Sequence, residues 1–278
     1  MSQVDLTIAE LPFHLVADEL ERLRANTPLV HVLTNEVVQC FTANTLLAIG
    51  ASPAMIVAEA EVADFAAIAD ALLINIGTVY PVRLQAMNLA IDAANAAATP
   101  WVLDPVAVGV LQYRRDAALA MLAKKPAAIR GNGSEILALA AALALNAEAI
   151  AGGKGVDSTM SSMSALSAAQ QLARATGAIV AVTGATDYIT DGEQTWAVPW
   201  GHPMMTRVVG TGCALSAVVA AFLADAPNRL NAVAAACAVM AIAGERAVEC
   251  SDGPGTFVAP FLDALHVIHP VQLRSYSE

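Results

Sequence analysis

Residues 72–104 read LLINIGTVYPVRLQAMNLAIDAANAAATPWVLD, and this stretch contains the unit that decides the fold. A short apolar run at 72–76 is followed by an alanine-rich helical segment at 82–97 and by a second apolar run at 101–103. Apolar runs without polar alternation are typical of buried strands, and a helix between two of them predicts a parallel β–α–β unit. Both strands end on polar side chains, namely Asn75 and Asp104.

The same alternation continues on both sides of this unit. Further buried strands are predicted at 29–33, 54–57, 127–129 and 179–182. The helical segments between strands lie at 35–49, 61–70, 117–123, 134–145 and 158–175. Strand–helix alternation of this kind predicts a mainly parallel central sheet covered by helices on both faces, which is a three-layer α/β/α fold.

The rhythm changes after residue 182. Two β-prone runs flank Asp191-Gly192, and an Asp-Gly pair between such runs is a strong hairpin signal. We therefore predict an antiparallel edge hairpin on the parallel sheet. Three helical segments follow at 211–224, 230–249 and 256–267, and Pro254-Gly255 separates the last two. No linker or charge run divides the chain, so we predict a single domain over residues 1–278.

Composition and charge exclude several classes of protein. The chain is 57% hydrophobic, and much of the excess is alanine, which favours closely packed helices. The apolar runs at 136–145, 208–224 and 232–243 are not clean spans of the ~20 apolar residues that a bilayer needs, so we expect core helices and no membrane association. The net charge of −11 argues against binding nucleic acid, which needs a basic surface.

The N-terminus and the cysteines point to the cytoplasm. Asp5 and Glu10 lie where a signal peptide would carry basic and then apolar residues. The four cysteines, at 40, 213, 237 and 250, have no Cys-x-x-Cys spacing. We expect reduced thiols in a cytoplasmic protein.

The tetrapeptide Gly210-Thr211-Gly212-Cys213 opens an apolar helix. Glycines let the backbone approach a ligand closely, and the first turn of a helix has free N–H groups that favour an anion. The pattern therefore predicts a site for a transferring phosphoryl group, although a plain helix cap without a ligand fits it as well. At this position the helix dipole would lower the pKa of Cys213, so that its thiolate could accept a proton; a small buried thiol is the alternative.

Other strand ends carry candidate ligands. Asp104 and Glu135 are the best candidates for Mg²⁺, which prefers one or two carboxylates together with waters and phosphate oxygens. The alternatives are an Asp-Pro turn for Asp104 and a helix-start carboxylate for Glu135, with Ser134 as the cap. Arg130 follows the fifth predicted strand, where it would pair with a nucleotide phosphate or lie free on the surface.

Several familiar sites are missing from the sequence. Gly152-Gly153-Lys154-Gly155 lacks the Ser or Thr that a P-loop needs after its lysine. The glycines at 210 and 212 lack the third glycine of a dinucleotide fingerprint. The histidines have no spacing for zinc, and no G-x-S-x-G elbow is present.

Taken together, the motifs resemble those of the hydroxyethylthiazole kinase family, which serves thiamine biosynthesis and salvage. Each motif is weak alone, but the ordered set is specific. They are Leu33-Thr34-Asn35, Gly50-Ala51-Ser52-Pro53-Ala54-Met55, Asn75-Ile76-Gly77-Thr78, Asp104-Pro105-Val106, Ile129-Arg130-Gly131-Asn132 with Ser134-Glu135-Ile136, Gly155-Val156-Asp157-Ser158, Val182-Thr183-Gly184 and Val209-Gly210-Thr211-Gly212-Cys213.

This resemblance implies a ribokinase-like fold and the transfer of the ATP γ-phosphoryl group, with Mg²⁺, to the primary hydroxyl of 4-methyl-5-(2-hydroxyethyl)thiazole. It also implies a homotrimer with active sites between subunits. The resemblance implies that Met55 and Gly210 contact the thiazole, with Asn35 nearby, and that Arg130 and Thr183 bind ATP. It implies that Asp104 and Glu135 bind magnesium. Cys213 would stand where most ribokinase-like relatives have a catalytic aspartate.

The chain departs from the family pattern at two positions. Ala107 stands where the family often has glycine, and Gly133 where alanine is more common. Ala107 adds a methyl group where the backbone would approach phosphate.

Three other functions remain as alternatives. One is a ribokinase-like kinase of another vitamin precursor, such as a hydroxymethylpyrimidine. Another is a hydrolase with Cys213 as nucleophile and His202 as its partner. The third is a nucleotide-binding sensor without catalysis.

Overall fold

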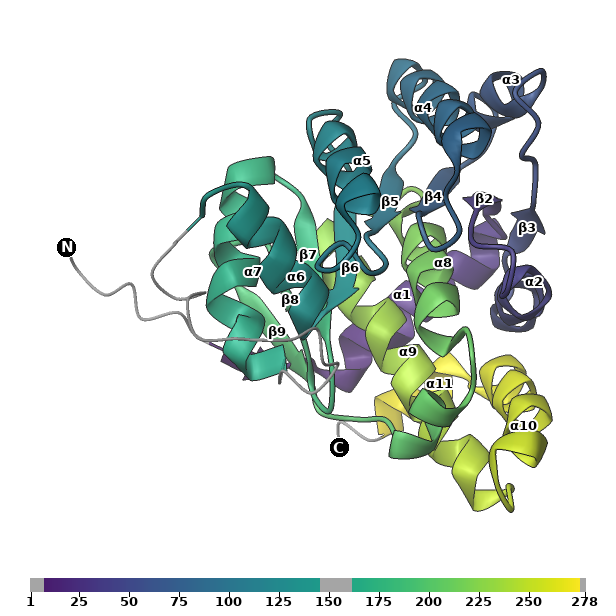
Figure 1. Ribbon diagram of the computed structural model, residues 1–278. Helices are drawn as coiled ribbons and strands as arrows, with labels where there is room; N and C mark the ends of the chain where they lie inside the picture. The colour runs from purple at the N-terminus through teal and green to yellow at the C-terminus, as the bar shows by residue number, and fades with distance from the viewer. Residues whose placement is uncertain (1–7, 146–161, 276–278) are drawn as a thin grey trace.

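The computed structural model of the protein describes residues 8–145 and 162–275. Within these residues, nine strands form one sheet in the order β1-β9-β8-β7-β6-β5-β4-β2-β3 (Figure 1). The strands are β1 (Ile8–Glu10), β2 (Leu29–Leu33), β3 (Ser52–Ala54), β4 (Ala71–Asn75), β5 (Trp101–Asp104), β6 (Ala128–Asn132), β7 (Ile179–Thr183), β8 (Asp187–Thr190) and β9 (Thr195–Val198).

The helices fill the connections between these strands and the C-terminal part of the chain. They are α1 (Phe13–Asn26), α2 (Gln39–Ile49), α3 (Val62–Ala66), α4 (Pro81–Ala96), α5 (Gln112–Leu122), α6 (Gly133–Ala142), α7 (Ser162–Thr176), the 3-10 helix η1 (Pro203–Arg207), α8 (Thr211–Leu223), α9 (Arg229–Glu249), α10 (Pro254–Val267) and α11 (Pro270–Ser275).

The sheet is parallel from β3 to β7, and the antiparallel pair β8 and β9 then extends it. The predicted mainly parallel sheet with an antiparallel hairpin is therefore confirmed. The hairpin is not the outermost element, because β1 pairs in parallel with β9. The sequence did not predict β1, which is only three residues long.

Two hydrophobic cores cover the two faces of the sheet. Side chains alternate between them, so that Leu73 of β4 belongs to the core under α8 and α9, whereas Leu72 and Ile74 face α4. The first core includes α1, α8, α9 and α10, and the second includes α4, α6 and α7. Parallel strands buried on both faces explain the continuous apolar runs in the sequence.

Helix α9 is long and apolar enough to cross a membrane by length and composition alone. Most of it is buried inside the protein, where it packs against α1, α8 and α10. Its apolar surface is therefore explained by the core, as expected for the run at 232–243.

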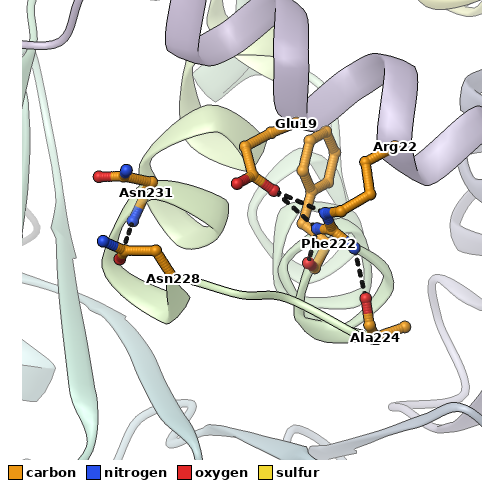
Figure 2. Close-up of polar contacts among 6 residues, drawn as sticks. All are labelled: Glu19, Arg22, Phe222, Ala224, Asn228 and Asn231. Atoms are coloured by element: carbon orange, nitrogen blue, oxygen red, sulfur yellow. Dashed lines mark hydrogen bonds and ion pairs between the residues drawn. The ribbon is translucent and has the colours of Figure 1, made fainter.

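Helix α8, whose start carries the Gly-Thr-Gly-Cys motif, is fixed at its other end (Figure 2). The guanidinium of Arg22 in α1 donates to the backbone carbonyls of Phe222 and Ala224, both at 2.5 Å, and pairs with Glu19. The last carbonyls of a helix lack helical partners and carry the negative end of its dipole, so a cation suits them. Just beyond, the side chain of Asn228 caps α9 by accepting the N–H of Asn231 at 3.1 Å.

Candidate active site

The carboxyl ends of the parallel strands bring the predicted polar residues together. Asn75 of β4 lies beside Asp104 of β5, and Asn132 of β6 lies beside Thr183 of β7. Asn35 follows β2 in a turn where its side-chain oxygen accepts the N–H of Val37 at 3.2 Å. This turn explains why α2 begins at Gln39 rather than at the predicted residue 35.

Asp104 is buried at the centre of this edge, with 1% of its surface exposed. Its Oδ2 atom accepts hydrogen bonds from Nδ2 of Asn75 at 2.6 Å and from the hydroxyl of Ser216 in α8 at 2.8 Å. Burial raises the pKa of Asp104 to about 7; Arg130 and these hydrogen bonds oppose the rise, and the negative charge of Glu135 adds to it. Two carboxylates whose negative charges act on each other favour the binding of a cation.

Cys213 lies on the other side of Asn75. The amide nitrogen of Asn35 donates to Oδ1 of Asn75 and to Sγ of Cys213, both at 3.2 Å. Burial, together with the charge of Asp104, raises the pKa of Cys213. The expectation of a lowered pKa at this helix start is therefore wrong, because burial and the charge of Asp104 outweigh Asn75, Arg130 and Asn35, which lower the pKa.

The two glycines at the start of α8 face different parts of the site. Gly210 has φ +99°, and a Cβ there would lie 2.9 Å from Cγ1 of Val38 and 3.2 Å from the ring of Phe41. A Cβ on Gly212 would instead lie 2.9 Å from the guanidinium of Arg130. Each glycine thus allows a close approach, one toward α2 and one toward Arg130.

The hydroxyl of Thr211, a residue that borders the cavity beside Arg130, is bound within the protein. This hydroxyl donates to the carbonyl of Met205 at 2.9 Å, which attaches η1 to the start of α8. Thr211 therefore offers its backbone N–H to a ligand rather than its hydroxyl. As the predicted anion site requires, the first turn of α8 has N–H groups without helical partners.

Arg130 and Thr183 border a cavity of about 520 Å³. The guanidinium of Arg130 donates to the Thr183 hydroxyl at 2.5 Å, and its buried Nε atom has no partner in the described part of the chain. The polar wall also includes Gly212 and Asp187, and the apolar wall is formed by Trp200, Met205, Leu215 and Met240. Arg130 is thus turned into the cavity, which disfavours the alternative of a free surface charge.

Glu135 lies in the first turn of α6, where its carboxylate accepts backbone N–H groups. Its Oε1 atom accepts the N–H of Ala107 at 3.0 Å, and its Oε2 atom accepts the N–H of Asn132 at 2.9 Å. Asn132 in turn caps α6 by accepting the N–H of Glu135, so that Asn132, not Ser134, is the cap. Ala107 has φ +60°, a conformation that favours glycine and that accounts for the family preference.

Asp104 and Glu135 fit a magnesium site in which waters and phosphate oxygens supply the other ligands. Oδ1 of Asp104 accepts no hydrogen bond from the described residues, whereas both oxygens of Glu135 already accept backbone N–H groups. No group of three or more His, Cys, Asp or Glu side chains forms a metal cluster in the described ranges. One or two carboxylates with waters and phosphate oxygens suit Mg²⁺, while a protein-only metal cage does not fit this edge.

The remaining predicted residues have separate places. Met55 follows β3 and packs, half-buried, against the core that contains α8. His202 uses Nδ1 to accept the N–H of Met204 at 3.1 Å, and no hydrogen bond joins it to Cys213. A cysteine–histidine pair is therefore not formed between these described residues. The motif at 155–158 and the glycine-rich stretch at 152–155 lie outside the described residues.

Sequence reasoning did not assign roles to Asn75 and Ser216, which both bind Asp104. Asn75 was visible as a polar strand end. Ser216 had a signal too, since it is the one polar side chain in the apolar run at 214–224.

The topology and the ligand edge define a ribokinase-like α/β protein. A structure described as a ribokinase-like superfamily protein from Enterococcus faecalis superposes with a TM-score of 0.61 at 14% identity, covering 94% of this chain and 95% of that chain. At this identity the likeness concerns the fold alone.

The chain belongs to the hydroxyethylthiazole kinase family, whose pattern matches residues 20–270. It is 55% identical over 265 residues to a hydroxyethylthiazole kinase of Tolumonas auensis, covering 95% of this chain and 97% of that protein. The solved structure of a hydroxyethylthiazole kinase from Pyrococcus horikoshii has a TM-score of 0.83 and 37% identity, and the match covers 95% of this chain and 97% of that chain. The predicted family, fold class and kinase activity are confirmed.

Proposed function

We propose that the protein transfers the γ-phosphoryl group of ATP to the primary hydroxyl of 4-methyl-5-(2-hydroxyethyl)thiazole. Family membership supports the substrate. The observation that carries the proposal is the start of α8, where Gly210 faces α2 and Gly212 faces Arg130. An alcohol on one side and a nucleotide on the other would meet at the N–H groups of this one helix turn.

On the nucleotide side, ATP would occupy the cavity beside Arg130 and Thr183. Its volume of about 520 Å³ suits a small-molecule ligand. Trp200, Met205 and Met240 offer apolar surface for the base, and Arg130 offers its guanidinium to the phosphates. Asp104 and Glu135 would hold Mg²⁺, which supplies positive charge to the phosphate oxygens when bound.

On the alcohol side, Met55 and Gly210 would contact the thiazole, with Asn35 and Cys213 near its hydroxyl. The N–H groups of Gly210, Thr211, Gly212 and Cys213 would stabilise the charge on the transferring phosphoryl group. Phosphoryl transfer asks mainly for positioning and electrostatics. Cys213 would accept the hydroxyl proton only as a thiolate, a form that burial disfavours because it raises the pKa of the thiol.

A coupled assay of ADP release tests this proposal. Release should depend on the thiazole alcohol and on Mg²⁺, and should be much slower with a hydroxymethylpyrimidine. Turnover of an ester without ATP would instead favour a hydrolase, and ATP binding without a product from either alcohol would favour a sensor.

We further propose that the chain works in the cytoplasm as one domain and assembles as a homotrimer with active sites between subunits. Val37 and Val209 support an interface near the alcohol side, since each has 71% of its surface exposed and they adjoin the turn of Asn35 and Gly210. Light scattering should give three times the mass of one chain. The mass of a single chain would contradict the trimer.

A further inference from the structure

A chain of buried hydrogen bonds joins the carboxylate of Asp104 to the thiol of Cys213. It runs from Asp104 through the amides of Asn75 and Asn35. Asn75 is fully buried, and Asn35 has 6% of its surface exposed. Three strand ends and the start of α8 thus contribute to one connected polar network.

The orientation of the Asn75 amide is fixed from two sides. With Mg²⁺ bound, Asp104 would be an ionised carboxylate that only accepts hydrogen bonds, so Nδ2 of Asn75 faces it, at 2.6 Å. On the opposite side, Oδ1 of Asn75 accepts the backbone N–H of Gly77 at 2.9 Å, and a backbone N–H only donates. Both neighbours require the same orientation, which leaves Oδ1 turned toward Asn35.

The orientation of Asn35 follows from that of Asn75. Its own Oδ1 accepts the N–H of Val37, and both hydrogens of its Nδ2 have acceptors, which are Oδ1 of Asn75 and Sγ of Cys213. An N–H of Asn35 therefore points at the side chain of residue 213. A hydrogen-bond donor in this place stabilises the unprotonated form of that side chain, which is the form that can accept a proton.

We propose that Asn75 is a positioning residue for the alcohol side of the site, acting through Asn35. Its amide oxygen holds the nitrogen of Asn35 toward residue 213, so that the side chain at 213 can receive a hydrogen bond from the substrate hydroxyl. This role rests on the proposed kinase reaction. The hydrogen bonds of Asn75 go to Asp104, Asn35 and the N–H of Gly77, so its link to Cys213 runs through Asn35, and its amide also lowers the pKa of that thiol.

Ser216 provides the matched control. It donates to the same oxygen of Asp104 at 2.8 Å and is equally buried. Its other contact is the carbonyl of Gly212 in its own helix, at 3.5 Å, so it has no link to Asn35. Loss of either side chain removes one donor from Asp104, whereas only the loss of Asn75 frees Asn35.

The test compares KM for the thiazole alcohol and KM for ATP at saturating Mg²⁺ in three proteins: wild type, Asn75→Leu and Ser216→Ala. Asn75→Leu should raise KM for the alcohol about tenfold, the effect expected for one lost buried hydrogen bond. Ser216→Ala leaves the link between Asn75 and Asn35 intact, so its KM for the alcohol should stay within about twofold of wild type. If Asn75→Leu does not fold, Asn75→Ser replaces it with the same expectation.

A double-mutant cycle shows whether the effect passes through Asn35 or through the loop at Gly77. In an Asn35→Ala background, Asn75→Leu should raise the KM for the alcohol no further. An equal rise in both backgrounds, or no rise with Asn75→Leu in the native background, would overturn the inference while leaving the kinase intact. Wild-type protein without thiazole-dependent ADP release would overturn the proposed function and this inference together.

Discussion

At the scale of single residues, the two glycines of α8 separate the two halves of the site. Replacing Gly212 with alanine would place a methyl group against the Arg130 guanidinium, which must then move. Because that guanidinium is the end of a flexible side chain, we expect folding to survive and KM for ATP to rise about tenfold through a weakened charged hydrogen bond. KM for the alcohol should change little.

Gly210→Ala is the matching variant on the alcohol side. Gly210 has a φ of +99°, which strains any residue with a Cβ, and the new methyl group would contact Val38. We expect a stability loss of about 1–2 kcal/mol and a higher KM for the alcohol. Identical effects of the two variants on both KM values would contradict the assignment of separate sides.

Cys213 is the site residue for which the structure departs most from the sequence-based expectation. Burial raises its pKa, so the thiol is mainly neutral near pH 7, whereas an aspartate beside the Asn35 donor would be a better anionic base. We predict that Cys213→Asp has a kcat at least equal to that of wild type. Cys213→Ala should have a kcat about ten- to a hundredfold lower. A folded but inactive Cys213→Asp would show that position 213 does not accept the proton.

Asp104 should make stability depend on pH in the protein without Mg²⁺ or nucleotide. Its pKa is about 7 when folded, against about 4 in an unfolded chain. The folded protein therefore keeps a proton that the unfolded chain releases, and this stabilising contribution is lost as the pH rises toward 7. Asp104→Asn removes the effect.

Urea unfolding at pH 5 and pH 8 measures this contribution. Between these values, wild type should lose on the order of 2 kcal/mol more than Asp104→Asn. Parallel losses in the two proteins would mean that Asp104 does not titrate in this range.

At the scale of elements, α8 connects the active site to α1. Arg22→Met would leave the carbonyls of Phe222 and Ala224 without a cation and would unpair Glu19. We predict a loss of about 2–3 kcal/mol in the free energy of unfolding. The control is Arg274→Met, which removes exposed ion pairs to Asp18 and Glu21 and should leave the melting temperature nearly unchanged. Equal shifts for the two variants would contradict the capping role.

Helices and strands were predictable from the sequence where their own pattern was strong. The apolar runs of β2, β4 and β5 and the Asp-Gly hairpin were placed correctly. By contrast, α1 was missed, although its buried residues Val16, Leu20 and Leu23 recur at helical spacing. The strand predicted at 54–57 lies at Ser52–Ala54 instead, where β3 pairs with residues 29–31 of β2.

At the scale of the whole molecule, the order of the strands decides where the site lies. The sequence showed polar residues after successive strands, and parallel pairing places them at one edge. It did not show which of them touch. The contact of Asp104 with Asn75 follows from the pairing of β4 with β5. The contact of Asp104 with Ser216 depends on how α8 crosses the sheet, a relation between segments more than a hundred residues apart that local patterns do not record.

The most direct test of the central claim is ADP release by the purified protein with ATP, Mg²⁺ and 4-methyl-5-(2-hydroxyethyl)thiazole, with formation of the thiazole phosphate followed in parallel. We predict one phosphorylated alcohol for each ADP, loss of both products without Mg²⁺, and little turnover of a hydroxymethylpyrimidine. ADP release that does not respond to the thiazole alcohol would contradict the account.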